Sequence, residues 1–191
     1  SIFYPDHQKH LKDKIRVVFY GRPNNPRNGF RLGIEALKLV KSHFGDNIEI
    51  VSVGSEYNTS EYGLEGVVKN LGLLPTIEDV AKLYRSCDVG LVFMFTPHPS
   101  YQPLEYMASG CATVTNINEG NTWILRDKEN VLLTEPTVTC VADNIINLLE
   151  NENLRSKIIN NGLETVSNLN SWETELDNLY FFLKNPKIEL K

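Results

Sequence analysis

The sequence has 191 residues, of which 41% are hydrophobic and 23% are charged, and its net charge is −5. This composition is typical of a globular protein with a core, and the length favours one domain over two. Without a Lys/Arg cluster a nucleic-acid partner is not expected, and no apolar run approaches the ~18 residues of a membrane span. We therefore expect at most peripheral membrane contact. The three cysteines are widely spaced, which indicates reduced thiols in the core. Reduced thiols favour a cytoplasmic protein, which could lie at the inner face of the membrane.

Short apolar segments typical of strands alternate along the chain with segments of helical period. The expected strands are residues 15–20, 48–54, a short one within 67–74, 89–95, 112–116 and 130–134. The expected helices are residues 30–44, 77–87, 103–110, 141–150, 153–169 and 171–183, with Thr76 and Ser171 as caps of the second and the last. This alternation predicts an α/β fold, a doubly wound parallel sheet with helices on both faces. Ligands of such sheets bind beyond the carboxyl ends of the strands.

The first strand ends in a loop that is rich in glycine, asparagine, proline and arginine, YGRPNNPRNGFR. Its arginines are Arg22, Arg27 and Arg31. A guanidinium fork matches phosphate oxygens, and a helix N-terminus nearby favours an anion, so the loop indicates a diphosphate site. The alternative is that these are solvated arginines paired with surface acids. The loop is neither a Walker A motif nor GxGxxG.

The stretch TPHPSYQPLE, residues 96–105, follows the fourth expected strand. Its three prolines restrict the backbone just before a helix, so its remaining amides are expected to be held ready for a phosphate. Glu105 lies in the first turn of that helix, either to accept hydroxyl groups of a ribose or only because the helix dipole favours an acid there. His98 is an acid or base near neutral pH, a phosphate donor, or a loop histidine without a role.

A series of motifs resembles, in order, the C-terminal nucleotide-sugar-binding domain of retaining group 1 glycosyltransferases, which is one half of a Rossmann-like GT-B fold. The matching segments are YGRP and RNGF, SVG, LYRSCDVGLVFMF, PLEYMASGCATVTN and DNIINLLENENLRSKIINNG. The resemblance covers residues 15–183. The wording GRP, RN and PHPSY-x-PLE is more specifically similar to bacterial rhamnosyltransferases of surface-polysaccharide assembly, of the WsaF type.

The resemblance assigns binding roles to the residues that match the family's motifs. It implies that Gly21, Arg22 and Arg27 bind the donor diphosphate, with arginine at position 27 in place of the usual lysine. It implies that Glu105 holds the donor ribose hydroxyls. The turn whose amides meet the phosphates falls on Pro99, Ser100 and Tyr101.

One position departs from the family pattern. The family's first glutamate, which contacts the donor sugar, falls on Pro97 here. Either His98 takes part of that role, or the acceptor half of the enzyme supplies the contact. We therefore count His98, Arg22 and Arg27 as the candidate catalytic residues.

The implied reaction transfers a sugar from a nucleotide-diphosphate donor to an acceptor hydroxyl. The two arginines would stabilise the charge on the departing diphosphate, and no metal or cofactor is expected, since there is no DxD triplet. The resemblance makes deoxythymidine-diphosphate rhamnose the preferred donor, and uridine- or guanosine-diphosphate sugars stay open. With a deoxyribose in the donor, Glu105 has only a 3′-hydroxyl to hold. A glycan or lipid-linked acceptor would be bound through an N-terminal domain that this sequence lacks, so the chain alone is expected to bind nucleotide without transfer activity.

The expected organisation has three parts. Residues 1–14 form a linker or crossing segment, residues 15–170 the donor-binding domain, and residues 171–191 a helix and tail that cross to the missing domain or pack on this one. Two other functions stay open: a nucleotide-sugar 2-epimerase of the same architecture, and a non-catalytic anion-binding module of flavodoxin-like type. The missing acid at position 97 argues against the first, and the arginines after the first strand argue against the second.

Overall fold

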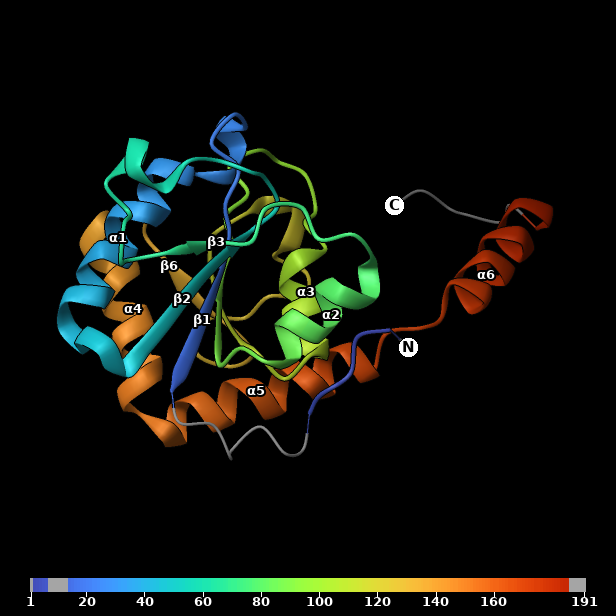
Figure 1. The fold of residues 1–191 in the computed structure, drawn as a ribbon. Coiled ribbons are helices and arrows are strands. Elements are labelled where there is room, and N and C mark those ends of the chain that lie inside the picture. The colour runs from blue at the N-terminus through green and yellow to red at the C-terminus, as the bar shows by residue number, and fades with distance from the viewer. Residues whose placement is uncertain (1, 7–13, 186–191) are drawn as a thin grey trace.

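The computed structural model describes residues 2–6 and 14–185. Its centre is one sheet of six parallel strands in the order β3-β2-β1-β4-β5-β6 (Figure 1). The strands are β1 (Ile15–Tyr20), β2 (Ile48–Val53), β3 (Lys69–Asn70), β4 (Val89–Leu91), β5 (Ala112–Asn116) and β6 (Leu132–Thr134). The direction of winding reverses between β1 and β4, as in Rossmann folds. The predicted Rossmann-like, doubly wound class is confirmed.

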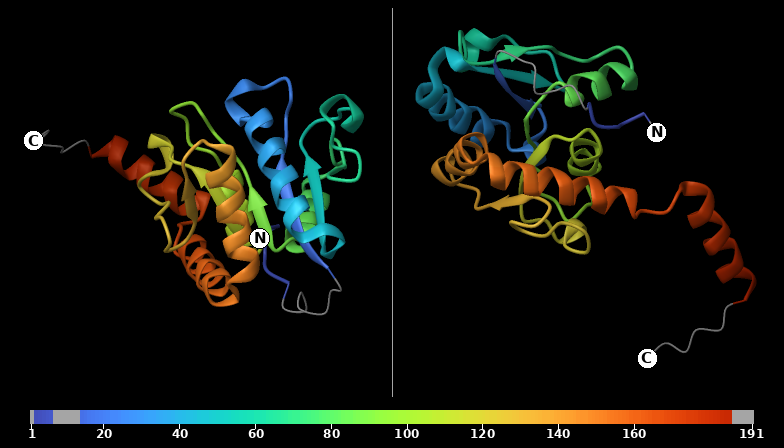
Figure 2. Two further views of the ribbon diagram at one scale, coloured as in Figure 1. Left: turned by 90° about the vertical axis from the view of Figure 1, so that its left-hand side faces the viewer. Right: turned by 90° about the horizontal axis from the view of Figure 1, so that it is seen from below.

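Helices cover both faces of the sheet. The helices are α1 (Phe30–Phe44), α2 (Ile77–Arg85), α3 (Gln102–Ala108), α4 (Val138–Glu150), α5 (Glu152–Ser167) and α6 (Trp172–Lys184). Helix α1 packs against α4 on one face, whereas α2 and α3 lie on the other and α5 runs along α3 (Figures 1 and 2). The two layers bury both faces of the central strands, whereas β3 at the edge of the sheet has an exposed Lys69 and a half-buried Asn70.

Alternate residues of β1 serve the two halves of the core. Val17 and Phe19 pack in the cluster under α1 and α4. Val18 points the other way, into a cluster with Tyr84 and Tyr106. All three β1 side chains are fully buried, which explains the continuous apolar run that a doubly covered parallel strand requires.

Several element bounds differ from the prediction. Helix α1 has the predicted bounds, and Thr76 and Ser171 cap α2 and α6 as expected. Helix α4 begins three residues earlier, because the Thr137 side chain accepts a hydrogen bond from the Cys140 amide. Strand β4 ends at Leu91 rather than at residue 95. After Leu91, the Met94 amide donates to the Asn116 side chain and the Phe95 amide donates to the Arg27 carbonyl, instead of to the backbone of β5.

The three cysteines are thiols, as predicted, but they do not share one environment. Cys87 and Cys111 are buried in the core. Cys140 is only half-buried, in the first turn of α4. The prediction of a core position is therefore wrong for Cys140.

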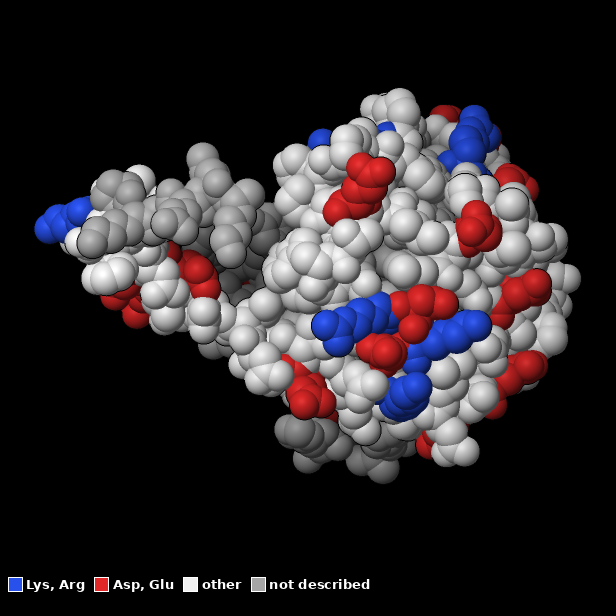
Figure 3. All heavy atoms as spheres, turned by 180° about the vertical axis from the view of Figure 1, so that it is seen from behind, with Lys and Arg blue, Asp and Glu red and all other residues white. Residues whose placement is uncertain are grey.

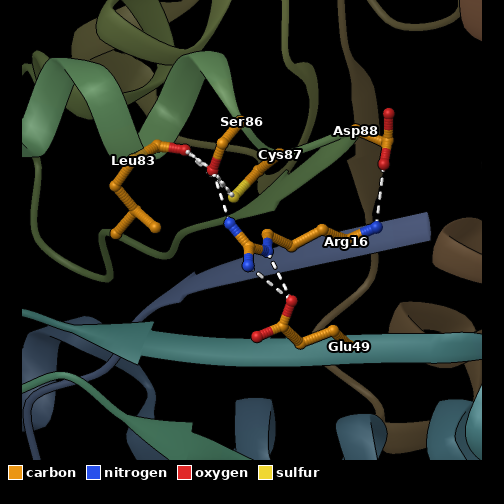
Figure 4. Close-up of polar contacts among 6 residues, drawn as sticks. All are labelled: Arg16, Glu49, Leu83, Ser86, Cys87 and Asp88. Atoms are coloured by element: carbon orange, nitrogen blue, oxygen red, sulfur yellow. Dashed lines mark hydrogen bonds and ion pairs between the residues drawn. The ribbon is translucent and has the colours of Figure 1, made fainter. Parts of the chain in front are cut away.

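The amino-terminal edge of the sheet is tied by Arg16 (Figure 4). Its guanidinium lies 2.6 Å from Glu49 Oε2 on β2 and donates to Ser86 Oγ at 2.8 Å. Its amide donates to Asp88 Oδ2 at 2.8 Å. Arg16 thus joins β1 to β2 and to the turn between α2 and β4, at the edge opposite the one where ligands are expected.

Helix α6 stands away from the rest of the molecule (Figures 1 and 2). None of its described side chains is buried; Trp172 is 73% exposed and Phe181 is 70% exposed. The alternative in which this helix packs on its own domain is therefore not what the structure shows, and its crossing to another domain stays a prediction. Of the predicted linker, residue 1 and residues 7–13 lie outside the described residues.

Two surface properties bear on partners. On the face drawn in Figure 3, Lys and Arg side chains lie beside Asp and Glu side chains, so that this face offers no extended positive field for a polyanion. In the described part of the chain, no helix combines the length and the apolar character that crossing a bilayer requires.

Candidate functional site

The loops that follow β1 and β4 meet at the point where the winding of the sheet reverses. The Phe95 amide donates to the Arg27 carbonyl at 2.8 Å. The Asn28 side chain, which is 2% exposed, donates from Nδ2 to the Phe93 carbonyl at 3.2 Å. The structure therefore brings together the two strand exits that the sequence singles out, and it does so by direct hydrogen bonds.

Glycines let the first loop lie close to its neighbours. Gly21 is buried, and a Cβ there would lie 3.0 Å from the Phe19 ring. Gly29 has φ +56°, and a Cβ there would lie 2.5 Å from the Phe95 ring and 3.0 Å from Phe93. A side chain at position 29 would thus be strained in its backbone and would push apart the two loops that form the site.

The three arginines near the first loop have different surroundings. Arg22 is half-buried and Arg27 is exposed, and neither has an ion-pair partner among the residues that the structure describes. The Arg31 guanidinium instead lies over the Tyr62 ring, 4.8 Å from its centroid. The alternative of arginines paired with surface acids therefore does not describe Arg22 and Arg27, and both guanidinium groups are available to an anion.

Side chains at the end of β5 and in the segment that follows it hold the second loop, which comes after β4. Asn116 accepts from the Met94 amide at 2.8 Å and donates to the Met94 carbonyl at 3.0 Å. Asn118 donates to the His98 carbonyl at 2.9 Å, and Asn121 accepts from the Ser100 amide at 3.2 Å. These asparagines were missed by the sequence reasoning; their signal is the asparagine- and glycine-rich stretch NINEGN that follows the strand.

The Ser100 amide does not lie ready for a phosphate. It already donates to Asn121, and the side chain of Ser100, which is 5% exposed, donates to Gln102 Oε1 at 2.6 Å. The expectation that this amide is available is therefore wrong, because an asparagine amide group satisfies it. Ser100 holds the loop together, whereas Tyr101 is 59% exposed beside it.

The His98 ring is exposed and has a defined hydrogen bond. Its Nδ1 lies 2.6 Å from the Pro99 carbonyl oxygen. Since a carbonyl only accepts, Nδ1 carries the proton, and Nε2 is left as the basic nitrogen of the neutral ring. Pro97 and Pro99 flank this histidine on the surface.

Glu105 lies in the first turn of α3 and is half-buried. Burial raises the pKa of its carboxyl above the ordinary value. Its charge also contributes, after burial, to raising the pKa of Tyr84. Within the described ranges, Glu105 has neither a hydrogen-bond nor an ion-pair partner for its carboxylate. The helix dipole alone would favour an acid at this position without burying it. A half-buried carboxylate without a partner among the described residues suits a ligand that donates hydroxyl hydrogens.

The loops after β1 and β4 carry cationic side chains as well as a base and an acid. Arg22 and Arg27 carry positive charge in the first loop, and His98 and Glu105 carry a base and an acid around the second. Among residues 2–6 and 14–185, no group of three or more His, Cys, Asp and Glu side chains is placed to hold a metal ion; that no metal is needed stays a prediction.

Comparisons with known proteins agree with this architecture. The family model "WsaF, C-terminal domain" matches residues 15–146. The chain is 45% identical over 185 residues to the O-antigen biosynthesis protein RfbC of Myxococcus xanthus, covering 97% of this chain and 14% of that protein. It is 29% identical to a phosphatidyl-myo-inositol mannosyltransferase of Mycobacterium leprae, covering 78% of this chain and 41% of that protein. The chain thus spans well under half the length of these relatives.

Solved structures share the fold. The C-terminal domain of the group 1 glycosyltransferase LpcC from Francisella tularensis has a TM-score of 0.71 at 23% identity, covering 87% of this chain and 94% of that one. Sucrose-phosphate synthase from Thermosynechococcus elongatus has a TM-score of 0.78 at 22% identity, covering 97% of this chain and 51% of that one. Anabaena HepE, solved with UDP and glucose, has a TM-score of 0.77 at 19% identity, covering 96% and 54%. With the switch-point site, the family match and these neighbours in agreement, the chain belongs to the WsaF C-terminal domain family, and it has the fold of the C-terminal half of GT-B glycosyltransferases.

Proposed function

We propose that this chain is the donor-binding half of a glycosyltransferase that uses a nucleotide-diphosphate sugar. The observation that carries the proposal is that Arg22 and Arg27, in the loop that follows β1 at the switch point of the sheet, have no ion-pair partner among the described residues. Guanidinium forks match the oxygens of a diphosphate. The Arg27 carbonyl accepts from the Phe95 amide, so the backbone that carries this arginine is held against the loop after β4.

The reaction breaks the bond between the sugar's anomeric carbon and the terminal phosphate oxygen. The bonding electrons leave with the nucleoside diphosphate, the acceptor oxygen forms the new bond to the anomeric carbon, and the acceptor proton passes to the departing diphosphate oxygen. Negative charge therefore grows on the diphosphate in the transition state. Arg22 and Arg27 stabilise that growing charge more than they stabilise the ground state, which lowers the barrier.

Glu105 and His98 act on the two ends of the donor. The Glu105 carboxylate accepts the 3′-hydroxyl hydrogen of the nucleoside sugar, and this hydrogen bond offsets the cost of the desolvation that raises its pKa. His98 presents Nε2 beside position 97, where proline replaces an acid, and contacts the transferred sugar. Gly21, Pro99 and Tyr101 shape the surface on which the diphosphate lies. No metal or cofactor is assigned a role.

The substrate is proposed as deoxythymidine-diphosphate rhamnose, and the product as a rhamnosylated surface glycan. Support comes from the family match and from a relative that is named for O-antigen biosynthesis. The acceptor, a glycan or a lipid-linked glycan, binds a second domain, toward which the exposed apolar face of α6 extends. A cytoplasmic location fits the free state of the cysteines.

The identity of the donor is tested by calorimetric titration of the chain with thymidine, uridine and guanosine diphosphates. Thymidine diphosphate is expected to bind most tightly. If uridine or guanosine diphosphate binds more tightly, the rhamnose assignment falls while the donor-binding function stands. If none binds at about millimolar concentration, the donor-binding function itself is wrong.

A further inference from the structure

A hollow of about 410 Å³ lies outside the site described above, between the segment after β5 and the C-terminal half of α5. Its volume is within the range of about 300 to 1,000 Å³ that small-molecule sites occupy. Its lining combines one large aromatic side chain with amide, hydroxyl and carboxylate groups; these include Trp123, Arg126, Asn161, Glu164, Thr165 and Asn168.

Trp123 provides a fixed aromatic surface at this hollow. Its side chain is 65% exposed, although the neighbouring Ile124 and Leu125 are buried. Its indole N–H donates to the Gly120 carbonyl at 3.0 Å. The ring is therefore held in one orientation with its polar group satisfied, and what remains for a ligand is a flat apolar face.

The floor of the hollow is rigid. Asn130 is 5% exposed and donates to the Ile124 carbonyl at 2.9 Å and to Thr165 Oγ1 at 3.0 Å. It also accepts from the Arg126 amide at 2.8 Å. One buried asparagine thus joins the Trp123 segment to α5, so the two walls of the hollow keep their distance without a ligand.

The polar wall has unused hydrogen-bonding capacity. Asn161 donates one hydrogen bond, to the Glu129 carbonyl at 3.0 Å, which leaves its side-chain oxygen to accept. The side-chain carboxylate of Glu164 and the side-chain amide of Asn168 have no hydrogen-bond partner within the described part of the chain. Arg126 lies 3.9 Å from Glu129, so charges of both signs are present. This mixture suits a neutral ligand with many hydroxyl groups better than a strongly charged one.

The hollow is connected to the candidate donor site through the segment of residues 117–126. Asn118 of this segment donates to the His98 carbonyl at 2.9 Å. Gly120 touches the same loop, since a Cβ there would lie 2.7 Å from the Pro99 amide nitrogen and 2.8 Å from the His98 carbonyl carbon. One side of the segment therefore supports the second site loop, and Trp123, three residues further, faces the hollow.

We infer that this hollow is a carbohydrate subsite, in which one pyranose ring packs its apolar face on Trp123 while Asn161 and Glu164 accept its hydroxyl hydrogens. The inference rests on the proposed function, because the sugar belongs to the glycan acceptor. The subsite holds a unit of the acceptor chain away from the reacting end, and it gives this domain its own share in acceptor binding. Binding there is separate from binding of the nucleotide.

The test is an NMR titration of the 191-residue chain, labelled with nitrogen-15, with methyl α-L-rhamnopyranoside and with a rhamnose trisaccharide. The sequence has two tryptophans, Trp123 and Trp172, so the indole N–H region contains one signal for the hollow and one internal control on α6. Trp172→Phe assigns the two signals. We expect a saturable shift of the Trp123 signal at millimolar sugar, tighter for the trisaccharide, and no saturable shift of the Trp172 signal.

Two variants separate stacking from folding. Trp123→Ala is expected to weaken sugar binding at least about tenfold, whereas Trp123→Phe, which keeps an aromatic face, is expected to retain most of it. Glu164→Gln is expected to weaken binding severalfold. Both side chains, Trp123 and Glu164, are exposed, so the unfolding transition of each of the three variants is expected to match that of the parent chain.

Two results would overturn the subsite: no shift of the Trp123 signal at about 50 mM sugar, or sugar-induced shifts confined to residues 21–29 and 96–105. A titration of the same samples with thymidine diphosphate distinguishes this failure from failure of the proposed function. Nucleotide binding that survives Trp123→Ala, with sugar binding lost, supports the subsite. If sugar binds at Trp123 but no nucleotide binds anywhere, the subsite stands and the donor-binding function falls.

Discussion

The amide of Phe95 donates to the carbonyl of Arg27 at 2.8 Å, so that the loops after β1 and β4 form one continuous surface. The bond places an arginine of the first loop against the backbone of the second. It also explains why β4 is short, since the chain leaves the sheet after Leu91 to make this contact. The candidate site is therefore built by hydrogen bonds between loops on top of the sheet that carries them.

The contact between the loops depends on glycine at position 29. Gly29→Ala is expected to destabilise the fold by roughly 1 to 3 kcal/mol, because the new Cβ adds a clash with Phe95 to the strain of a positive φ. Gly45→Ala is the matched control: Gly45 has φ +58° with nothing within 4 Å of a Cβ. Urea unfolding measures both variants. Equal costs for the two would mean that the Phe95 contact contributes nothing.

Asn116 holds the loop after β4 by two hydrogen bonds, one from the Met94 amide and one to the Met94 carbonyl. Asn116→Ala leaves the Met94 amide and carbonyl without their partner in a buried place, and it is expected to cost about 2 to 4 kcal/mol of unfolding free energy. Asn24→Ala, in the exposed part of the first loop, is the control and is expected to change stability by less than about 0.5 kcal/mol. A loss at position 116 no greater than at position 24 would show that the clamp is replaced by water.

Glu105 is expected to oppose folding at neutral pH while it supports binding. Its pKa is higher in the folded chain than in the unfolded chain, because burial disfavours the charged form. Between these two pKa values the folded state binds more protons, so stability falls as pH rises through that window. Glu105→Gln is therefore expected to stabilise the chain at pH 7, with the gain shrinking as the pH falls from the folded-state pKa to the unfolded-state pKa and absent below it.

The same variant is expected to bind nucleotide more weakly than the parent chain, since a neutral amide oxygen accepts the 3′-hydroxyl hydrogen less strongly than a charged carboxylate does. Glu135→Gln, at an exposed acid, corrects for the loss of one negative charge. Unfolding curves at several pH values and nucleotide titrations give the two readouts. A variant that neither stabilises the fold nor weakens binding would remove Glu105 from the site.

Helix α6 adds no buried side chain to the rest of the molecule. A chain that ends at residue 170 is therefore expected to unfold with a free energy within about 0.5 kcal/mol of the full chain. It is also expected to bind less of a hydrophobic dye, because Trp172, Phe181 and other apolar side chains of the exposed helix are gone. A clear drop in stability on truncation would show that α6 packs on this domain in solution.

The sequence predicts the regular elements well and the site partly. Helix α1 follows from its apolar spacing and has the predicted bounds. The parallel sheet with helices on both faces follows from the alternation of strands and helices and from the single hand of their crossovers, whereas the order of the strands comes from the structure. Local patterns of this kind are visible in a single sequence.

The contacts between distant loops are not visible in this way. Asn116 ends β5 and Asn118 and Asn121 follow it, and only the fold brings their side chains to the backbone of residues 94–100. The Ser100 amide was expected to be available because the prolines around it restrict the chain, but such restriction says nothing of an acceptor supplied 21 residues later. The direction of the Arg31 side chain, onto Tyr62, is hidden for the same reason.

The most direct test of the donor-binding account is a calorimetric comparison of three arginine variants with thymidine diphosphate. Arg22→Ala and Arg27→Ala are each expected to weaken binding by roughly 1.5 to 3 kcal/mol, the usual contribution of a charged hydrogen bond. Arg31→Ala removes the same charge from the same part of the chain, but its guanidinium stacks on Tyr62, and its effect is expected to be small. Equal losses for all three variants would mean that only net charge matters, and unchanged affinity in the first two would contradict a diphosphate site at the switch point.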